Sequence, residues 1–237
     1  MDKLIFLDTE TTGNDLLADR LVQISYSHSG KLISEFFKAP VPISIKAQSI
    51  THITNKMIGD KKPFSQSEMK KELEALLKEN IIVAHNAQFD LAMLAHEGLV
   101  APKFICTLKI ARFLDEEEKI AEYNLQFLRY YFELDIKADA HSAQGDVLVL
   151  EAVFKKLYDR MMETHNDHET VINKMIEMSS SPFLFRTFNF GKHKGKKVED
   201  VAKFDKPYLE WLLVQKTQNQ GEEDWIYTLK HYLSRVD

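Results

Sequence analysis

The order of apolar and polar positions predicts a sheet at the start of the chain. Residues 4–7 form a continuous apolar run, which is typical of a buried central strand. Residues 21–26 and 31–37 alternate with period two around Ser29 and Gly30, so they predict two further strands joined by a tight turn. An antiparallel meander should therefore open the fold.

Helical periodicity dominates after residue 66. Apolar positions three and four apart predict helices at 67–77, 88–97, 108–114, 124–132 and 143–161, with short strands at 81–84 and 105–106. Three strands followed by helices that alternate with two more strands predict an α/β fold, in which helices flank a mixed sheet.

The last quarter of the chain is expected to form a separate small α+β domain. Residues 164–182 are polar and end in a Ser-Ser-Ser-Pro run, which predicts a linker. The expected division is thus an N-terminal domain over 1–163, this linker, and a C-terminal domain over 183–237. Phenylalanines that alternate with polar residues before a glycine-bracketed basic turn, at 191–195, predict a β-hairpin. Asp205 and the early Pro207 predict a helix start beyond it.

Composition narrows the setting of the protein. With 44% hydrophobic and 28% charged residues among 237, the chain has enough apolar side chains for one large core and a smaller one. No apolar run approaches the roughly 18 residues that span a membrane, so no membrane partner is expected. Cys106 is the only cysteine, which excludes an intramolecular disulfide and favours the cytoplasm. These features leave the oligomeric state open.

Charge is distributed unevenly along the chain. The formal net charge is -5, which by itself disfavours a nucleic-acid partner. Residues 181–237, however, carry ten Lys and Arg against eight Asp and Glu, whereas residues 1–180 carry 21 against 28. Between Arg186 and Lys197 there are five positive charges and no acid. The lysines of this stretch, which are either a solvated loop or a contact to a nucleic-acid backbone, are Lys192, Lys194, Lys196 and Lys197.

Asp8 and Glu10 directly follow the first buried strand. Side chains two apart on a strand point to the same side, so these carboxylates are expected to converge. The Asp-x-Glu pattern recurs at Asp115 and Asp167, but there it lies in charged stretches without a preceding apolar strand. The turn Thr11-Thr12-Gly13 after Glu10 offers amides and hydroxyls to a phosphate. Taken alone, the pair fits either a structural cap or a metal site.

Two more carboxylates lie at helix starts. Asp90 follows the strand at 81–84, with His85 and Asn86 at the junction where α/β sheets place ligands. Asp146 opens the last long helix, five residues after His141. Each also has a simpler interpretation, because an acid in the first turn stabilises a helix and a lone histidine is more often a surface or capping residue.

In this order, the three motifs closely resemble those of the DEDDh exonuclease family. Asp-x-Glu ends the first strand, His-Asn-x₃-Asp occupies a strand-to-helix junction, and His-x₄-Asp opens a late helix. The resemblance implies a ribonuclease H-like fold and 3′-to-5′ removal of mononucleotides. It also implies two Mg²⁺ or Mn²⁺ ions, with His141 as general base and four carboxylates as ligands, namely Asp8, Glu10, Asp90 and Asp146.

The resemblance also indicates how the substrate would be held. Residues 49–54, which include His52, resemble a family segment that packs by the 3′ nucleotide. Family members often have an apolar residue where this chain has Asn14, so an apolar contact to the last base would have to come from Leu16 or Leu17. The expected substrate contacts in this domain are Thr11, Thr12, Gly13, His52 and Asn86.

The C-terminal segment carries a likeness of its own. The stretch from Phe190 to Lys196, the Tyr208-Leu209-x-Trp211-Leu212 pattern and residues 228–233 resemble the exonuclease X branch of the family, which acts on DNA. DNA is therefore favoured over RNA as partner, although the acids themselves do not distinguish a 2′-hydroxyl, and an exoribonuclease is the first alternative. A catalytically silent nucleic-acid-binding module is the second; it would need a missing acid or base, and none is missing. The aromatic residues expected in the core of this segment are Phe188, Phe190, Trp225 and Tyr232.

Overall fold

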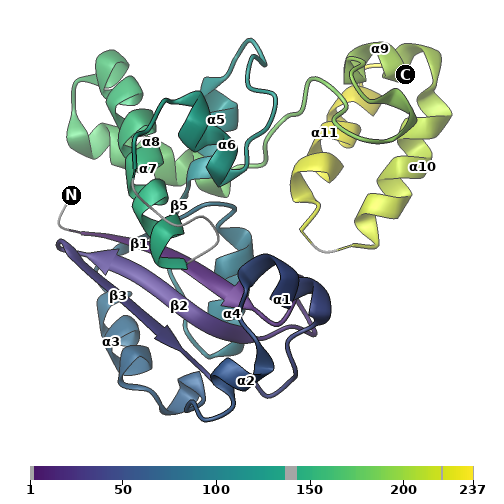
Figure 1. Ribbon diagram of the computed structural model, residues 1–237. Coiled ribbons are helices and arrows are strands. Elements are labelled where there is room, and N and C mark those ends of the chain that lie inside the picture. The colour runs from purple at the N-terminus through teal and green to yellow at the C-terminus, as the bar shows by residue number, and fades with distance from the viewer. Residues whose placement is uncertain (1–2, 137–142, 220, 237) are drawn as a thin grey trace. The chain divides into compact units, whose positions relative to one another are not determined.

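The protein was analysed as a computed structural model, which describes residues 3–136, 143–219 and 221–236. The chain divides into two compact units, Met1–Ser179 and Ser180–Asp237. Figure 1 draws both, and each is considered by itself. Within the described ranges, none of the helices combines the length and apolarity that crossing a bilayer requires.

A five-stranded mixed sheet forms the centre of the first unit. Its strands are β1 (Leu4–Thr11), β2 (Leu21–His28), β3 (Lys31–Phe36), β4 (Ile81–Ala84) and β5 (Phe104–Cys106), in the order β3-β2-β1-β4-β5. Strand β1 pairs antiparallel with β2 and parallel with β4. The predicted meander and both later strands are confirmed.

Helices cover both faces of this sheet (Figure 1). One face packs against α3 (Glu68–Leu76) and α4 (Gln88–His96), and the other against α5 (Thr107–Leu114), α6 (Leu125–Tyr131), α7 (Ala143–His165) and α8 (His168–Ser180). Ile5 and Leu7 of β1 enter the first core, while Leu4 and Phe6 enter the second. The apolar run 4–7 is continuous because β1 is buried on both sides. The fold is the ribonuclease H-like α/β architecture that the sequence predicted.

Two short helices that periodicity did not reveal lie between β3 and α3. They are α1 (Ile45–Thr51) and α2 (Asn55–Ile58). Ser44 and Thr54 begin them, each with a side chain that accepts a hydrogen bond from the backbone amide three residues later. Their few apolar residues pack into a small separate cluster, which leaves no long amphipathic stripe to detect.

Helix α8 occupies most of the stretch 164–182 that was expected to be a linker. Its sequence is polar overall, but Val171, Ile172 and Met175 are buried in the core that also contains residues of α5, α6 and α7. Ser179, at the end of this stripe, is fully buried and donates a hydrogen bond to the Met175 carbonyl. A narrow apolar stripe within a polar stretch therefore makes this segment part of the first unit.

The second unit is built from α9 (Val198–Phe204), α10 (Lys206–Thr217) and α11 (Glu223–Leu233). Its core contains the expected aromatic residues, among them Phe188 and Trp225. The predicted hairpin is reduced to the single antiparallel bridge between Thr187 and Lys197, with one turn of 3-10 helix at Gly191–His193. A longer ladder does not form because the chain enters α9 directly after Lys197.

Candidate metal and catalytic site

Three carboxylates from distant parts of the chain converge at the sheet. Asp8 and Glu10 lie on the same side of β1, and Asp146 lies in the first turn of α7, which packs over that side (Figure 1). One oxygen from each of the three side chains lies within 4.8 Å of the others. The predicted convergence of these acids is therefore present in the fold.

Asp90, the fourth predicted acid, is fixed beside this cluster by β1 itself. It lies in the first turn of α4, is almost fully buried, and accepts hydrogen bonds from the Thr9 amide at 3.1 Å and the Thr9 hydroxyl at 2.7 Å. Thr9 lies between Asp8 and Glu10 in β1, so the strand that presents those two acids also orients Asp90. Through this contact Asp90 is bound to β1, in addition to any stabilisation of the start of α4.

Burial and neighbouring acids raise the pKa values of three of these carboxyl groups. Burial, and then the carboxylates of Asp90, Glu10 and Asp146, raise the pKa of Asp8 well above its usual range. Burial, with Asp146 and Asp90, raises the pKa of Glu10 to about 7. Burial also raises the pKa of Asp90 to about 7, although the hydrogen bonds from Thr9 oppose this shift.

This donor set fits hard divalent cations. Mg²⁺ and Mn²⁺ prefer carboxylate oxygens, and cations between the acids would relieve the repulsion that raises their pKa values. No Lys or Arg of the described residues is among the causes of the shifts of Asp8, Glu10 and Asp90. The geometry and the electrostatics thus agree with a metal site.

Gln126 is a site residue that the sequence analysis missed. Its side-chain amide donates a 2.6 Å hydrogen bond to Asp146 Oδ1. Arg129, one turn later on α6, donates to the Gln126 Oε1 across 3.3 Å and to the Ile136 carbonyl. No local sequence signal marks Gln126, because its contact depends on how α6 packs against α7.

The turn after Glu10 is held mainly by its own hydrogen bonds. Thr12 is fully buried; its hydroxyl donates to Asp19 at 2.7 Å and accepts from the Arg20 amide, and its own amide donates to the Arg20 carbonyl. Thr11 donates its hydroxyl to the Gly13 carbonyl. Because these hydroxyl protons are used internally, the two threonines shape the turn rather than offer donors to a phosphate. A Cβ on Gly13 would lie 2.4 Å from an Asp19 oxygen, so a side chain here would displace the carboxylate that binds the Thr12 hydroxyl and the Asp15 amide.

His52 and Asn86 share an unusual backbone conformation. His52, which ends α1, has φ of 58°, and Asn86, between β4 and α4, has φ of 62°. Both side chains are exposed. The left-handed region is unfavourable for most residues with a side chain, so both polar groups are presented from sharply turned backbone.

Of the two histidines in the motifs, only His85 lies within the described residues. His85 is enclosed: its Nε2 donates to the Tyr123 carbonyl at 2.7 Å and its Nδ1 contacts the Thr107 hydroxyl at 2.9 Å. Burial lowers the pKa of His85 to about 4, which keeps the ring neutral. His141, the predicted general base, lies outside the described residues.

The other Asp-x-Glu matches have structural roles. Asp115 is buried, unlike the solvated position expected for it, and accepts hydrogen bonds from the Lys119 and Ile120 amides and the Tyr123 hydroxyl. Asp167 accepts from the Thr170 amide at the start of α8. Both acids close turns through these hydrogen bonds.

The basic turn belongs to the second unit. Lys192 pairs with Asp205 at 2.7 Å, whereas Lys194, Lys196 and Lys197 are exposed. The Asp205 side chain thus contacts the basic turn instead of capping α10, although Pro207 lies in the first turn of that helix as predicted.

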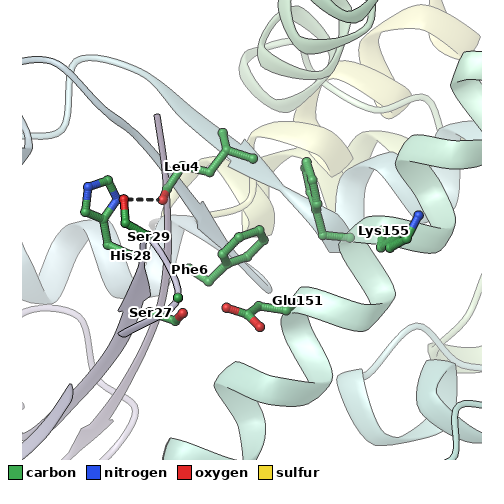
Figure 2. A pocket seen from close by; sticks show the side chains of 9 residues that line it. Leu4, Phe6, Ser27, His28, Ser29, Glu151 and Lys155 are labelled. Carbon is green, nitrogen blue, oxygen red and sulfur yellow. Dashed lines mark hydrogen bonds between the residues drawn. The ribbon is translucent and has the colours of Figure 1, made fainter. Parts of the chain in front are cut away.

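A pocket of about 330 Å³ lies at the start of β1 (Figure 2). It is bordered by β1, the β2–β3 turn and α7; Glu151 points toward Ser27 and Phe6, and the Lys155 amine points away. Its lining residues within the described part of the chain include none of the predicted site residues. The pocket is therefore separate from the acid cluster.

Comparison with known protein families decides the identity of the fold. The model described as Exonuclease matches residues 5–154, which contain all four acids, and a second model, Exodeoxyribonuclease X-like C-terminal, matches residues 188–216. The chain belongs to the Exonuclease family. The resemblance seen in the three motifs is thereby confirmed, and the alternative of a catalytically silent module has no support.

Relatives of this exonuclease match both of its units. Exodeoxyribonuclease 10 of Escherichia coli K12 is 30% identical over 242 aligned residues, which cover 98% of this chain and 100% of the relative. DNA polymerase III PolC-type of Streptococcus mutans is 28% identical over 74% of this chain but only 12% of its own length.

Solved structures agree with this assignment. Exonuclease X in complex with 5′ overhanging duplex DNA is 26% identical, with a TM-score of 0.58, and the match covers 75% of this chain and 99% of that one. Escherichia coli exonuclease I in complex with a dT13 oligonucleotide has a TM-score of 0.56 at 18% identity, over 69% of this chain and 42% of that one, which supports the fold alone.

Proposed function

We propose that this exonuclease releases nucleoside 5′-monophosphates from the 3′ ends of DNA with two divalent cations and a histidine base. The observation that carries the proposal is the convergence of Asp8, Glu10 and Asp146 within 4.8 Å. In a member of the Exonuclease family, such a cluster is the equipment that phosphodiester hydrolysis requires.

The acids and the cations would divide the work. Two bound Mg²⁺ or Mn²⁺ ions would help ionise a water on one side of the phosphorus and stabilise the leaving 3′ oxygen on the other. Asp8, Glu10, Asp90 and Asp146 would hold the ions and fix the scissile phosphate between them. Thr9 and Gln126 would limit the motion of Asp90 and Asp146 through their hydrogen bonds.

His141 is proposed to take the proton of the attacking water. An unperturbed histidine titrates near pH ~6.5, so it accepts a proton at neutral pH. His85 is a poor candidate for this role, because both of its ring nitrogens are engaged and burial lowers its pKa to about 4.

DNA is the proposed substrate class. The relative that matches nearly the whole chain is named as an exodeoxyribonuclease, and the solved structure of exonuclease X contains DNA. Exposed His52, Asn86 and the amides around Gly13 are proposed to contact the terminal nucleotide, and the lysines of the basic turn to contact the backbone. The exoribonuclease alternative predicts that RNA is degraded at least as fast.

The direct test is product analysis. Single-stranded DNA, RNA of the same sequence, and a duplex with a 3′ overhang, each labelled at the 5′ end, are incubated with the protein and Mg²⁺. The proposal predicts a ladder of products that shorten by one nucleotide, release of 5′-monophosphates, and faster loss of DNA than of RNA. Immediate release of a labelled mononucleotide would indicate attack from the 5′ end, and internal fragments would indicate an endonuclease. Faster loss of RNA would favour the alternative.

A further inference from the structure

The second unit exposes two large aromatic side chains beside its basic turn. Phe204, at the end of α9, is 60% exposed, and Trp211, on α10, is 54% exposed. The core of the same unit buries other aromatic rings, including Phe188 and Trp225. A domain of this size needs most of its apolar surface for its core, so these two exposed rings are apolar surface left available to a ligand.

Lysines of the basic turn lie over aromatic rings of α9 and α10. Lys196 Nζ lies 5.2 Å from the centre of the Phe204 ring, and Lys192 Nζ lies 4.7 Å from that of Tyr208. Tyr208 in turn lies 5.7 Å from Trp211, centre to centre. We call this the aromatic–lysine surface, and it consists of Lys192, Lys194, Lys196, Phe204, Tyr208 and Trp211.

The surface is held in place by contacts below it. His193 is buried under the turn and packs edge-on against Phe204 at 5.6 Å and Tyr208 at 4.8 Å. Asp205, which precedes α10, joins this helix to the basic turn. One of its oxygens contacts His193 at 2.8 Å and Lys192 at 2.7 Å. The rings and the turn are therefore positioned before any ligand arrives, which lowers the entropic cost of binding.

Gly191 completes this arrangement. It has φ of 66°, and a Cβ at this position would lie 2.8 Å from the Tyr208 hydroxyl. The absence of a side chain at Gly191 thus lets the backbone of the turn lie close to Tyr208.

The three lysines of this surface are not equivalent. The charge of Lys192 is offset by Asp205, and it has a structural role in linking the turn to α10. Lys194 and Lys196 are exposed, and Lys196 lies over a ring that is itself exposed. Lys194 and Lys196 are thus the lysines best placed to meet an external phosphate.

We propose that the aromatic–lysine surface binds a single nucleic-acid strand, with bases stacked on Phe204 and Trp211 and phosphates near Lys194 and Lys196. Exposed rings that alternate with cations match a strand in which unpaired bases alternate with phosphates. The charge calls for an anionic occupant, because five positive charges and no acid lie between Arg186 and Lys197. The exposed rings favour unpaired bases over an acidic protein helix or a membrane, because bases stack on such rings. A duplex keeps its base faces stacked, so it offers this surface only phosphates. The inference deepens the proposed function, because it rests on a nucleic-acid substrate and names the single strand as the form bound.

The test is binding of a fluorescent dT20 strand and of a matched blunt duplex to the full chain, in chelator, across a salt series. Chelator prevents cleavage and removes the metal-dependent contacts of the first unit. Phe204→Ala/Trp211→Ala should weaken dT20 binding by about tenfold or more and leave the salt slope unchanged. Lys194→Ala/Lys196→Ala should weaken binding and reduce the slope of log affinity against log salt by about 1.4, or about 0.7 for each contact.

Two control variants match these changes. Tyr227→Ala removes an exposed aromatic ring from α11, and Lys230→Ala removes an exposed lysine from the same helix. Both should bind dT20 like the wild type. Phe204→Tyr/Trp211→Tyr should restore most of the affinity, because stacking needs a ring and not a particular one. Thermal unfolding of every variant verifies that the second unit remains folded.

Several outcomes would overturn the proposal. These are wild-type dT20 affinity in Phe204→Ala/Trp211→Ala, an equal loss for dT20 and blunt duplex, or no measurable binding of dT20 by the wild type. The last result would point to a protein as the occupant. The proposed function is tested separately, by hydrolysis. If the wild type shortens DNA in Mg²⁺ but the ring variants bind dT20 normally, only the proposal about the aromatic–lysine surface is refuted.

Discussion

The side-chain amide of Gln126 donates a hydrogen bond to Asp146 Oδ1 across 2.6 Å. Gln126 therefore acts on the site through a carboxylate that comes from a different helix, α7. Arg129 holds the other end of the Gln126 amide and also the carbonyl of Ile136. Asp146 thus depends for its position on two side chains of α6 that have no direct part in the chemistry.

Loss of this support should weaken metal use more than DNA binding. For Gln126→Leu we expect an increase of about 10- to 100-fold in the Mg²⁺ concentration needed for half-maximal activity, or an equal loss of kcat, with little change in KM for DNA. The measurement is a Mg²⁺ titration of the hydrolysis rate. Gln144→Leu, at an exposed position of α7, is the matched control. Equal Mg²⁺ dependence in both variants would leave Gln126 with a packing role only.

His141 and His85 should respond differently to substitution. His141→Ala is expected to lower kcat on the order of 10²–10⁴-fold, as loss of a general base does, and to remove the fall in rate at low pH that arises because the base must be a neutral imidazole. His85→Gln should mainly reduce stability, because it breaks the contacts with Tyr123 and Thr107. Steady-state kinetics and thermal unfolding of both variants separate the two effects. A larger kcat loss in His85→Gln would show that the base has been misassigned.

The metal contribution to stability should grow with pH. The pKa values of Glu10 and Asp90 are raised to about 7, above those of the unfolded chain. Protonation of both acids therefore stabilises the folded state fully below pH ~4, and this stabilisation is lost as the pH rises through 7. Cations bind the ionised acids and should restore it. The increase in unfolding temperature on adding saturating Mg²⁺ is therefore expected to be small at pH 5 and largest at pH 8.

Asp8→Asn supplies the control for this pH dependence. The substitution removes one charge from the cluster, so it should raise the unfolding temperature in chelator at pH 8 and abolish most of the Mg²⁺-induced increase. A Mg²⁺ effect of equal size at pH 5 and pH 8, or one that survives in Asp8→Asn, would contradict the role assigned to these acids.

Leu17 and Leu16 offer a test of how the last base is held. Leu17 is 64% exposed and lies in a turn fixed by Asp15, whose side chain accepts hydrogen bonds from the Leu17 and Ala18 amides. Leu16 packs into the core, and its carbonyl contacts His96 at 2.7 Å. Leu17→Ala should reduce kcat/KM on a duplex end without loss of stability, whereas Leu16→Ala should lower the unfolding temperature. The reverse pattern would exclude Leu17 as a base contact.

Local sequence patterns predicted the elements that bury a continuous or periodic apolar face. Residues 4–7 revealed β1 because both of its sides are buried, and the stripe along α7 revealed that helix. Helix α8 was missed because its buried residues are few and its remaining positions are polar. The hairpin was predicted too long: Phe188 pairs with Lys196 and Gly195 across the turn, but the ladder stops at the Thr187–Lys197 bridge because α9 begins at Val198.

The site could be predicted only as far as its motifs are local. Asp8 and Glu10 follow the apolar run of β1, and Asp90 and Asp146 lie in the first turns of helices, so each was recognisable from its neighbours in the sequence. The contacts that orient them join residues 81 and 20 positions apart, Thr9 to Asp90 and Gln126 to Asp146. Such partners have no periodic signal, and neither does the exposure of Phe204 and Trp211.

The central claim is that Asp8, Glu10 and Asp146 hold the cations that drive hydrolysis. It is tested most directly by hydrolysis of 5′-labelled DNA by wild type and Asp146→Asn, with Mn²⁺ binding to each protein measured by electron paramagnetic resonance in the presence of uncleavable DNA. We expect two Mn²⁺ ions bound to the wild type, fewer in Asp146→Asn, and no hydrolysis by the variant or by the wild type in excess chelator. Wild-type hydrolysis that continues in chelator, or an Asp146→Asn variant that binds two ions and cleaves at the wild-type rate, would contradict the account.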